Sequence, residues 1–119
     1  MNMIQISEKI RDHLIQQNAQ SVHDDFHSCR YRGANGTMCA VGCLIKDEHY
    51  KLTFEGLSVG SKSVLDALRK SGLNFVQFDD IYEMLSRWQA YHDDSYRDWL
   101  GGSAEARSPT EMHNHIIGV

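Results

Sequence analysis

The sequence predicts a compact single domain over residues 1–119 that is mainly α with one small β-hairpin, an α+β fold. A chain of 119 residues can bury one modest hydrophobic core and is too short for two. Hydrophobic residues make up 41% of it, which favours a folded domain over a disordered chain. Apolar residues recur at helical spacing in several segments, whereas a hairpin turn dipeptide occurs once, as Asn35-Gly36.

The first helix is predicted to open at Ser7 and to run to about Asn18. Its apolar positions, Ile10, Leu14 and Ile15, lie on one side of a helix. The polar segment that follows contains no such period and is predicted to be a loop.

A hairpin is predicted around Asn35-Gly36, with Tyr31 and Met38 on its two strands. Both turn residues tolerate positive φ, as a tight hairpin turn requires. The apolar residues 40–45 are then expected to form a short helix. A glycine within that helix, Gly42, would cost about 1 kcal/mol relative to alanine, and close packing by the Trp88 ring would explain why it is tolerated.

Residues 51–60 are predicted to be irregular or extended, because two glycines interrupt them. Ser61 is a plausible N-cap for the next helix, and Gly72 followed by Leu73 is typical of a helix end. This helix presents Val64, Leu65 and Leu68 at helical spacing.

The strongest helical pattern begins with Asp80 as N-cap and Glu83 three residues later. Its apolar stripe is predicted to be core rather than a cofactor site; the stripe comprises Ile81, Met84, Leu85, Trp88 and Tyr91.

A short helical turn is predicted around 96–100, followed by a loop. Ser108, Pro109 and Glu111 then combine an N-cap, a first-turn proline and a capping-box glutamate, which predicts a last helix. We assign no role to His113 and His115, since histidines two residues apart on a helix face different ways.

Charge and cysteine content exclude several classes of function. The net charge of −4 gives no basic footprint for nucleic acid and is compatible with a basic protein surface as partner. No segment has the pattern of a secretory signal or the length of a membrane span. Three cysteines cannot all pair within one chain, so reduced thiols and a cytoplasmic location are expected.

A central motif, C-x-Y-R, a glycine-rich turn, C-A-V-G-x-L-I-x-D-E-x-Y and a later E-G, resembles a family of small phage- and prophage-encoded proteins. The later WQAYHDD segment and Trp99 are similar to the same family, which commonly has proline where this chain has Lys46. The resemblance implies a phage origin and a bacterial host cell, and it implies no particular chemistry. The positions that carry it are Cys29, Tyr31, Arg32, Cys39, Gly42, Asp47, Glu48, Tyr50, Glu55, Gly56, His92 and Asp93.

One set of residues suggests a cysteine-dependent enzyme. A helix beginning near residue 40 would place Cys39 at its N-terminus, where the helix dipole stabilises a thiolate. His92 as base and Asp93, or Glu48, as the group that orients it would complete the set used by papain-like hydrolases. Against this, an aspartate directly after a histidine on a helix usually points away from it. The alternative is that Cys39 is a small buried hydrophobe.

A second set suggests zinc. The spacing H-x3-H-x-C-x9-C-x3-C supplies five candidate ligands for a tetrahedral ion, but it contains no C-x2-C pair. The candidates are His23, His27, Cys29, Cys39 and Cys43.

A third set, Arg32, Asp47, Glu48 and Tyr50, suggests a polar binding surface near the predicted hairpin. Arg32 is suited to bind a carboxylate or phosphate. We favour the simpler interpretation that it forms an intramolecular ion pair with Asp47 or Glu48.

These observations leave three hypotheses for function. The first is a phage accessory protein that binds a bacterial host protein without chemistry, as an inhibitor or decoy, with counter-defence as one such role. The second is a small hydrolase or deamidase using Cys39 and His92. The third is a zinc-stabilised binding module; no other cofactor is expected, and the sequence does not predict an oligomeric state.

Overall fold

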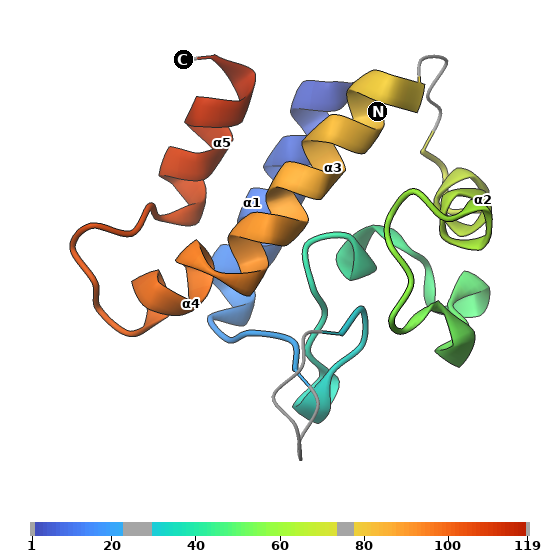
Figure 1. The fold of residues 1–119 in the computed structure, drawn as a ribbon, viewed down its shortest axis with the longest axis horizontal. Coiled ribbons are helices and arrows are strands. Elements are labelled where there is room, and N and C mark those ends of the chain that lie inside the picture. The colour runs from blue at the N-terminus through green and yellow to red at the C-terminus, as the bar shows by residue number, and fades with distance from the viewer. Residues whose placement is uncertain (1, 23–29, 74–77, 119) are drawn as a thin grey trace.

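The computed structural model describes residues 2–22, 30–73 and 78–118. Within these residues it is a flattened helical domain of about 38 × 37 × 20 Å. Five α-helices are connected by loops and short 3₁₀ turns (Figure 1). The helices are α1 (Met3–Gln17), α2 (Lys62–Lys70), α3 (Phe78–Asp93), α4 (Ser95–Leu100) and α5 (Pro109–Ile117).

Helix α1 lies between α3 and α5, and α2 lies on the opposite side of α3 from α5 (Figure 1). Four 3₁₀ turns lie between α1 and α2 in the order of the chain; the turns are Ala34–Gly36, Gly42–Leu44, Asp47–His49 and Leu52–Phe54. None of the described helices is long and apolar enough to cross a membrane.

The predicted β-hairpin is wrong, because the described residues contain no strand. What remains around the predicted turn is an antiparallel bridge between Arg32 and Met38, and the turn residues Asn35 and Gly36 have φ angles of 59° and 75°. An isolated pair of short strands is marginally stable in water. Here several backbone amides of the segment donate hydrogen bonds to side chains instead of to a longer partner strand. Glu55 accepts hydrogen bonds from the Tyr31 and Arg32 amides, and Gln17 accepts one from the Met38 amide.

The short helix predicted over 40–45 is reduced to the 3₁₀ turn Gly42–Leu44. Gly42 is closely packed, as expected, but against the backbone carbonyl of Tyr31 rather than the Trp88 ring. The irregular character predicted for 51–60 is confirmed apart from the turn Leu52–Phe54, and Gly56 has a φ of 84°.

Capping residues account for several helix ends, although Ser61, which precedes α2 as predicted, makes no capping hydrogen bond with its side chain. Ser108 and Glu111 form the predicted capping box of α5, and Gly72, at φ 102°, ends α2 with a hydrogen bond from the Leu73 amide to the Leu68 carbonyl.

Two helices begin earlier than predicted. Helix α1 starts at Met3 rather than Ser7, because Asn2 and Gln5 form a capping box of their own. Helix α3 starts at Phe78 rather than Asp80.

The core prediction for α3 is confirmed. Its five stripe residues are all buried and pack with Ile6, Ile10 and Leu14 of α1. The Trp88 and Tyr91 rings meet edge to face at 5.6 Å between centroids.

A buried polar chain crosses this core. The Trp88 indole Nε1–H donates to the Ser7 hydroxyl at 3.0 Å, and that hydroxyl lies 2.7 Å from Nδ1 of His113. Ser7 and His113 are both buried, so the chain connects α3, α1 and α5 through direct side-chain hydrogen bonds inside the core.

Candidate functional site

Cys39 lies in the core, with 1% of its surface exposed. Its sulfur accepts a hydrogen bond from the Gly42 amide at 3.2 Å, and burial raises the pKa of the thiol to about 12. A thiol in this state is protonated and weakly nucleophilic at neutral pH.

His92 is fully buried at the end of α3, and both of its ring nitrogens have partners. Nε2 accepts a hydrogen bond from the Ser21 amide at 3.0 Å, and Nδ1 lies 3.0 Å from Oδ1 of Asp93. Because a backbone N–H can only donate, Nε2 carries no hydrogen, so Nδ1–H donates to Asp93 and the ring is uncharged.

The structure therefore brings together only part of the predicted catalytic set. Asp93 does contact His92, contrary to the expectation that adjacent residues face apart. Cys39 and His92 share no hydrogen bond, since each is occupied by a backbone amide. Glu48, the other candidate for the orienting group, is exposed in the turn Asp47–His49. Both ring nitrogens of His92 bond to other residues.

The zinc candidates are described only in part. His23, His27 and Cys29 lie outside the described residues. Cys39 and Cys43 are free thiols, and the Cys43 thiol donates to the Ala40 carbonyl. Within residues 2–22, 30–73 and 78–118, no three histidine, cysteine or acidic side chains are grouped closely enough to hold a metal ion.

The predicted polar surface contains the ion pair we favoured. Arg32 bonds to Asp47 and to the Ile45 carbonyl, and its guanidinium lies 5.1 Å from the centre of the Tyr50 ring. Glu48 is exposed beside this group. Arg32 therefore joins the bridge segment to the 3₁₀ turns that follow it.

Glu55 is the centre of a second polar group, for which no separate role was predicted. Its carboxylate accepts from the Tyr31 amide at 2.9 Å, the Arg32 amide at 3.1 Å and the Tyr50 hydroxyl at 2.6 Å. It also lies 3.6 Å from the Arg30 guanidinium. Such a carboxylate is fixed in position by its donors.

Next to Glu55 the surface contains a pocket of about 220 Å³. Three parts of the chain, far apart in sequence, meet there: the segment around Tyr31, the Glu55–Ser58 turn and the end of α3. Several positions of the motifs quoted in the sequence analysis are on its wall. The lining residues are Arg30, Tyr31, Cys39, Glu55, Gly56, Leu57, Ser58, Gln89 and Asp93.

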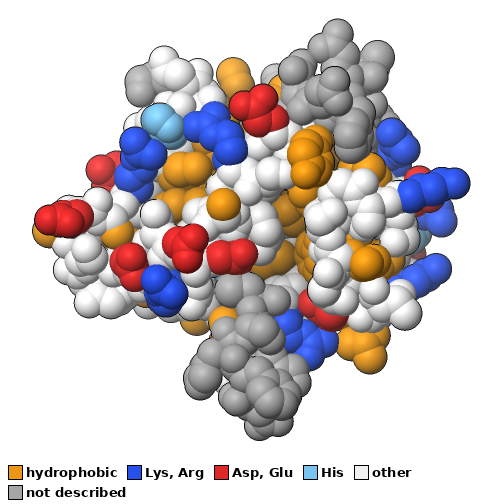
Figure 2. Space-filling model, viewed as in Figure 1, with side chains coloured by type: hydrophobic (Ala, Val, Ile, Leu, Met, Phe, Trp, Pro, Cys, Tyr) orange, Lys and Arg blue, Asp and Glu red, His pale blue; other side chains and the backbone are white. Residues whose placement is uncertain are grey.

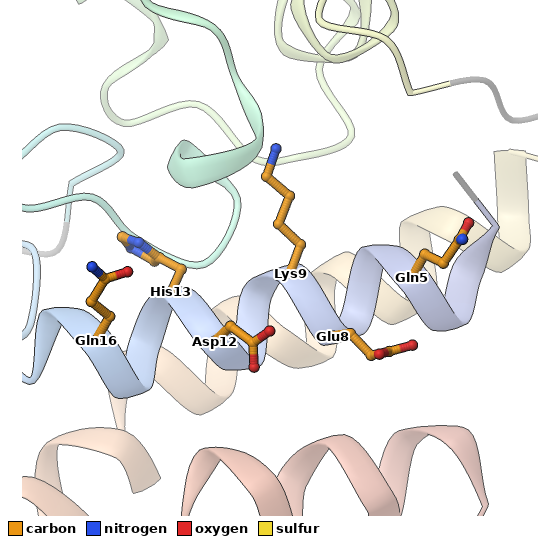
Figure 3. Close-up of a pocket in the computed structure, with 6 residues that line it drawn as sticks. All are labelled: Gln5, Glu8, Lys9, Asp12, His13 and Gln16. Atoms are coloured by element: carbon orange, nitrogen blue, oxygen red, sulfur yellow. The ribbon is translucent and has the colours of Figure 1, made fainter.

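A larger hollow of about 490 Å³ lies along the polar face of α1 (Figure 3). Lys9 and His13 point toward the 3₁₀ turns, whereas Glu8 and Asp12 point to the other side of the helix (Figure 3). His13 donates to the Met38 carbonyl, and Asp12 pairs with Arg11. This face is a mixed, solvated helix surface, and we regard the smaller pocket as the better candidate site.

Comparison with known proteins identifies no relative: no family model, no curated protein and no solved structure matches the chain.

Sequence reasoning missed residues whose role depends on distant partners. Gln89 connects the Val41 amide to Asp93, and Ser21 donates to His92. The signals for Gln89 were its place in the WQAYHDD segment and its position one residue after Trp88, at the edge of the buried stripe of α3. His113, which received no role, is part of the buried chain with Ser7.

Proposed function

We propose that the chain is a phage or prophage accessory protein that binds a bacterial host protein and alters it without chemistry, as an inhibitor or decoy. The observation that carries this proposal is the burial of Cys39. Its sulfur is occupied by the Gly42 amide, and the predicted base, His92, is occupied by the Ser21 amide. Residues that suggest an enzyme in the sequence thus serve to hold the fold.

Binding is also favoured by the character of the surface. Figure 2 shows acidic side chains gathered over α4 and the adjoining end of α3. The overall charge is −4, and large apolar side chains such as Leu52 and Leu57 are exposed. Interfaces of soluble proteins combine such apolar and charged groups.

The first test is alkylation of the folded protein between pH 5 and 9, read for each cysteine by mass spectrometry. We expect Cys39 to remain unlabelled until the protein is unfolded in urea, while the half-buried Cys43 serves as internal reference. Rapid labelling of Cys39 well below the ordinary thiol pKa of about 8.5 would contradict the proposal and favour the hydrolase. Protection that a zinc chelator removes would favour the zinc module.

The second test concerns the partner. The folded chain is immobilised, proteins from a bacterial lysate are captured, and each candidate is purified and titrated against the chain by calorimetry. The proposal requires a purified protein that binds with defined stoichiometry and whose own activity changes on binding. If no captured protein rebinds after purification, the proposal is wrong.

A further inference from the structure

Helix α5 lies at the edge of the domain, and its main packing partner is α1 (Figure 1). Pro109 and Met112 bury their side chains, and the Tyr91 hydroxyl donates to the Arg107 carbonyl just before the helix begins. The segment that precedes α5 is exposed over residues 101–105. A peripheral helix that follows an exposed loop can open locally while the remaining helices stay packed.

The buried polar chain also holds α5 in place, and its hydrogen bonds require His113 to be uncharged. An indole nitrogen can only donate, so Ser7 accepts from Trp88 and has one hydrogen of its own to give. The described residues offer that hydrogen one acceptor, Nδ1 of His113, at 2.7 Å from the Ser7 oxygen. Nδ1 therefore carries no hydrogen while the chain is intact, and the neutral ring has its hydrogen on Nε2.

Protonation of His113 would break this chain. A hydrogen on Nδ1 would turn the ring into a donor, so that Trp88 and His113 would both direct hydrogens at Ser7. The hydroxyl hydrogen of Ser7 would then lose its acceptor at a fully buried residue. A buried unsatisfied group and a buried charge both cost free energy, so the protonated ring favours a state in which it reaches water.

The charged groups that act on the ring come from α1. Burial lowers the pKa of His113 below its ordinary value of 6.5, and the charge of Arg11 lowers it further, whereas Glu8 and Asp12 raise it. Arg11 itself lies 4.0 Å from the Glu8 carboxylate and 2.8 Å from that of Asp12. Among the described residues, no carboxylate bonds to His113, so a charge on the ring would have no direct partner in the core.

The other elements around His113 do not supply such a partner. Helix α3 contributes the uncharged indole of Trp88. On α5 itself, Glu111 accepts from the Ser108 amide in the capping box, and His115 is exposed. The ring is therefore stable in the core only while it is neutral.

We propose that α5 is a pH-sensitive switch, which packs on α1 while His113 is neutral and is released from α1 when His113 is protonated, with α2 and α3 still packed. This device is independent of the proposed function. Because the packed state binds the proton less readily than the released state, release increases as the pH falls below 6.5. Release uncovers Ser7 and the side of α1 against which α5 packs.

Hydrogen exchange of the backbone amides in the unmodified chain, corrected for the intrinsic exchange rate at each pH and read by NMR in low concentrations of urea, tests the switch. At every pH, the amides of Met112 and His113 should be protected at least about tenfold less than those of Leu85 and Trp88 in α3, and their exchange should depend less on urea. Between pH 7.5 and pH 5.5 the protection of the α5 amides should fall by as much as about tenfold, the limit for one group with an ordinary pKa of 6.5. A fall of less than about twofold would overturn the proposal. Equal protection and equal urea dependence in α5 and α3 would also overturn it, because α5 would then open only when the whole domain unfolds.

His113→Asn removes the titrating ring but keeps an amide oxygen that can accept from Ser7. In this variant the change in α5 protection between pH 7.5 and pH 5.5 should shrink to less than about twofold. His115→Asn is the matched control, because it removes an exposed histidine from the same helix and should keep the pH dependence of the unmodified chain. An unaltered pH dependence in His113→Asn would overturn the proposal.

If His113→Asn does not fold, the imidazole of His113 in the unmodified chain decides the question. Two-dimensional ¹H–¹⁵N spectra at pH 7.5 should show its hydrogen on Nε2, and the ring should gain its second hydrogen over the same pH range in which the α5 amides lose protection. Hydrogen on Nδ1 at pH 7.5, or protonation of the ring without any loss of α5 protection, would overturn the proposal.

Discussion

The α-carbon of Gly42 faces the carbonyl oxygen of Tyr31 so closely that a Cβ atom at residue 42 would overlap it. The obstacle is backbone, which cannot rotate away as a side chain can. Gly42→Ala should therefore lower the free energy of unfolding by about 2–4 kcal/mol, measured by urea denaturation. Gly101→Ala is the control, because a Cβ there would make only ordinary contacts, and its stability should be unchanged or slightly higher. An unchanged melting temperature for Gly42→Ala would contradict this packing.

Glu55 should contribute to stability through its hydrogen bonds more than through its charge. In Glu55→Gln, one of the two carboxylate oxygens becomes an NH₂ group, which cannot accept a hydrogen bond. The variant therefore loses either the bond from the Tyr31 amide or the bonds from the Arg32 amide and the Tyr50 hydroxyl, depending on which oxygen is replaced. We expect a loss of about 2–4 kcal/mol in the free energy of unfolding. Glu48→Gln, at an exposed position, should change it by less than about 0.5 kcal/mol. Equal effects of the two substitutions would show that the acceptor role of Glu55 is unimportant.

His92 should act as a structural acceptor for the segment that follows α1. In His92→Ala the Ser21 amide loses its partner in a buried place, so we expect a loss of stability of about 2–3 kcal/mol. Hydrogen exchange of the Ser21 amide should be slow in the unmodified chain and much faster in the variant. Two-dimensional ¹H–¹⁵N spectra of the imidazole should show hydrogen on Nδ1. Hydrogen on Nε2 instead would rule out the bond from Ser21.

Acidification should weaken the packing of α5 on α1. The pKa of His113 is lowered from its ordinary value of 6.5, first by burial and then by the charge of Arg11, while Glu8 and Asp12 act in the opposite direction. The folded state therefore binds a proton less readily than the unfolded state. Stability from this residue is complete above pH 6.5 and is lost as the pH falls below it toward the lowered pKa.

The urea midpoint should accordingly fall between pH 7.5 and pH 5.5, and it should fall less in His113→Asn, which removes the titrating ring. His13, whose pKa is lowered mainly by burial, contributes in the same direction and remains in both proteins as a common background. A steeper pH dependence in His113→Asn than in the unmodified chain would contradict this assignment.

Elements defined by local signals were predicted well from the sequence. The capping box of α5, the glycine end of α2 and the buried stripe of α3 each depend on residues within a few positions of one another. The early start of α1 was also visible, because Asn2 and Gln5 have capping-box spacing, but the apolar period that we used begins later.

The prediction of a hairpin failed because the formation of strands depends on residues that are distant in the sequence. Asn35-Gly36 determines a turn, and the turn is present, but whether strands extend from it depends on which groups pair with the adjoining amides. Those partners are Gln17 and Glu55, on either side of the segment in sequence. Nothing in the spacing of residues 30–40 identifies them.

The sequence predicted which residues could be reactive at the candidate site, but it did not predict how deeply they are buried or what they bond to. Reactivity of Cys39 and His92 depends on burial and on which atoms their hydrogen-bond partners occupy. The sequence correctly suggested the ion pair between Arg32 and Asp47, because both charges lie in one short segment. It gave no indication that Gln89 and Glu55 line the same pocket.

The contact between α1 and α5 has a consequence for synthesis on the ribosome. Ile6 and Ile10 belong to α1, whereas α5, the helix against which α1 packs most extensively, is made only after α2, α3 and α4. Until Pro109–Ile117 has left the exit tunnel, the apolar face of α1 lacks that cover. The nascent chain is therefore expected to stay incompletely folded, and to be a substrate for chaperones, until α5 has emerged.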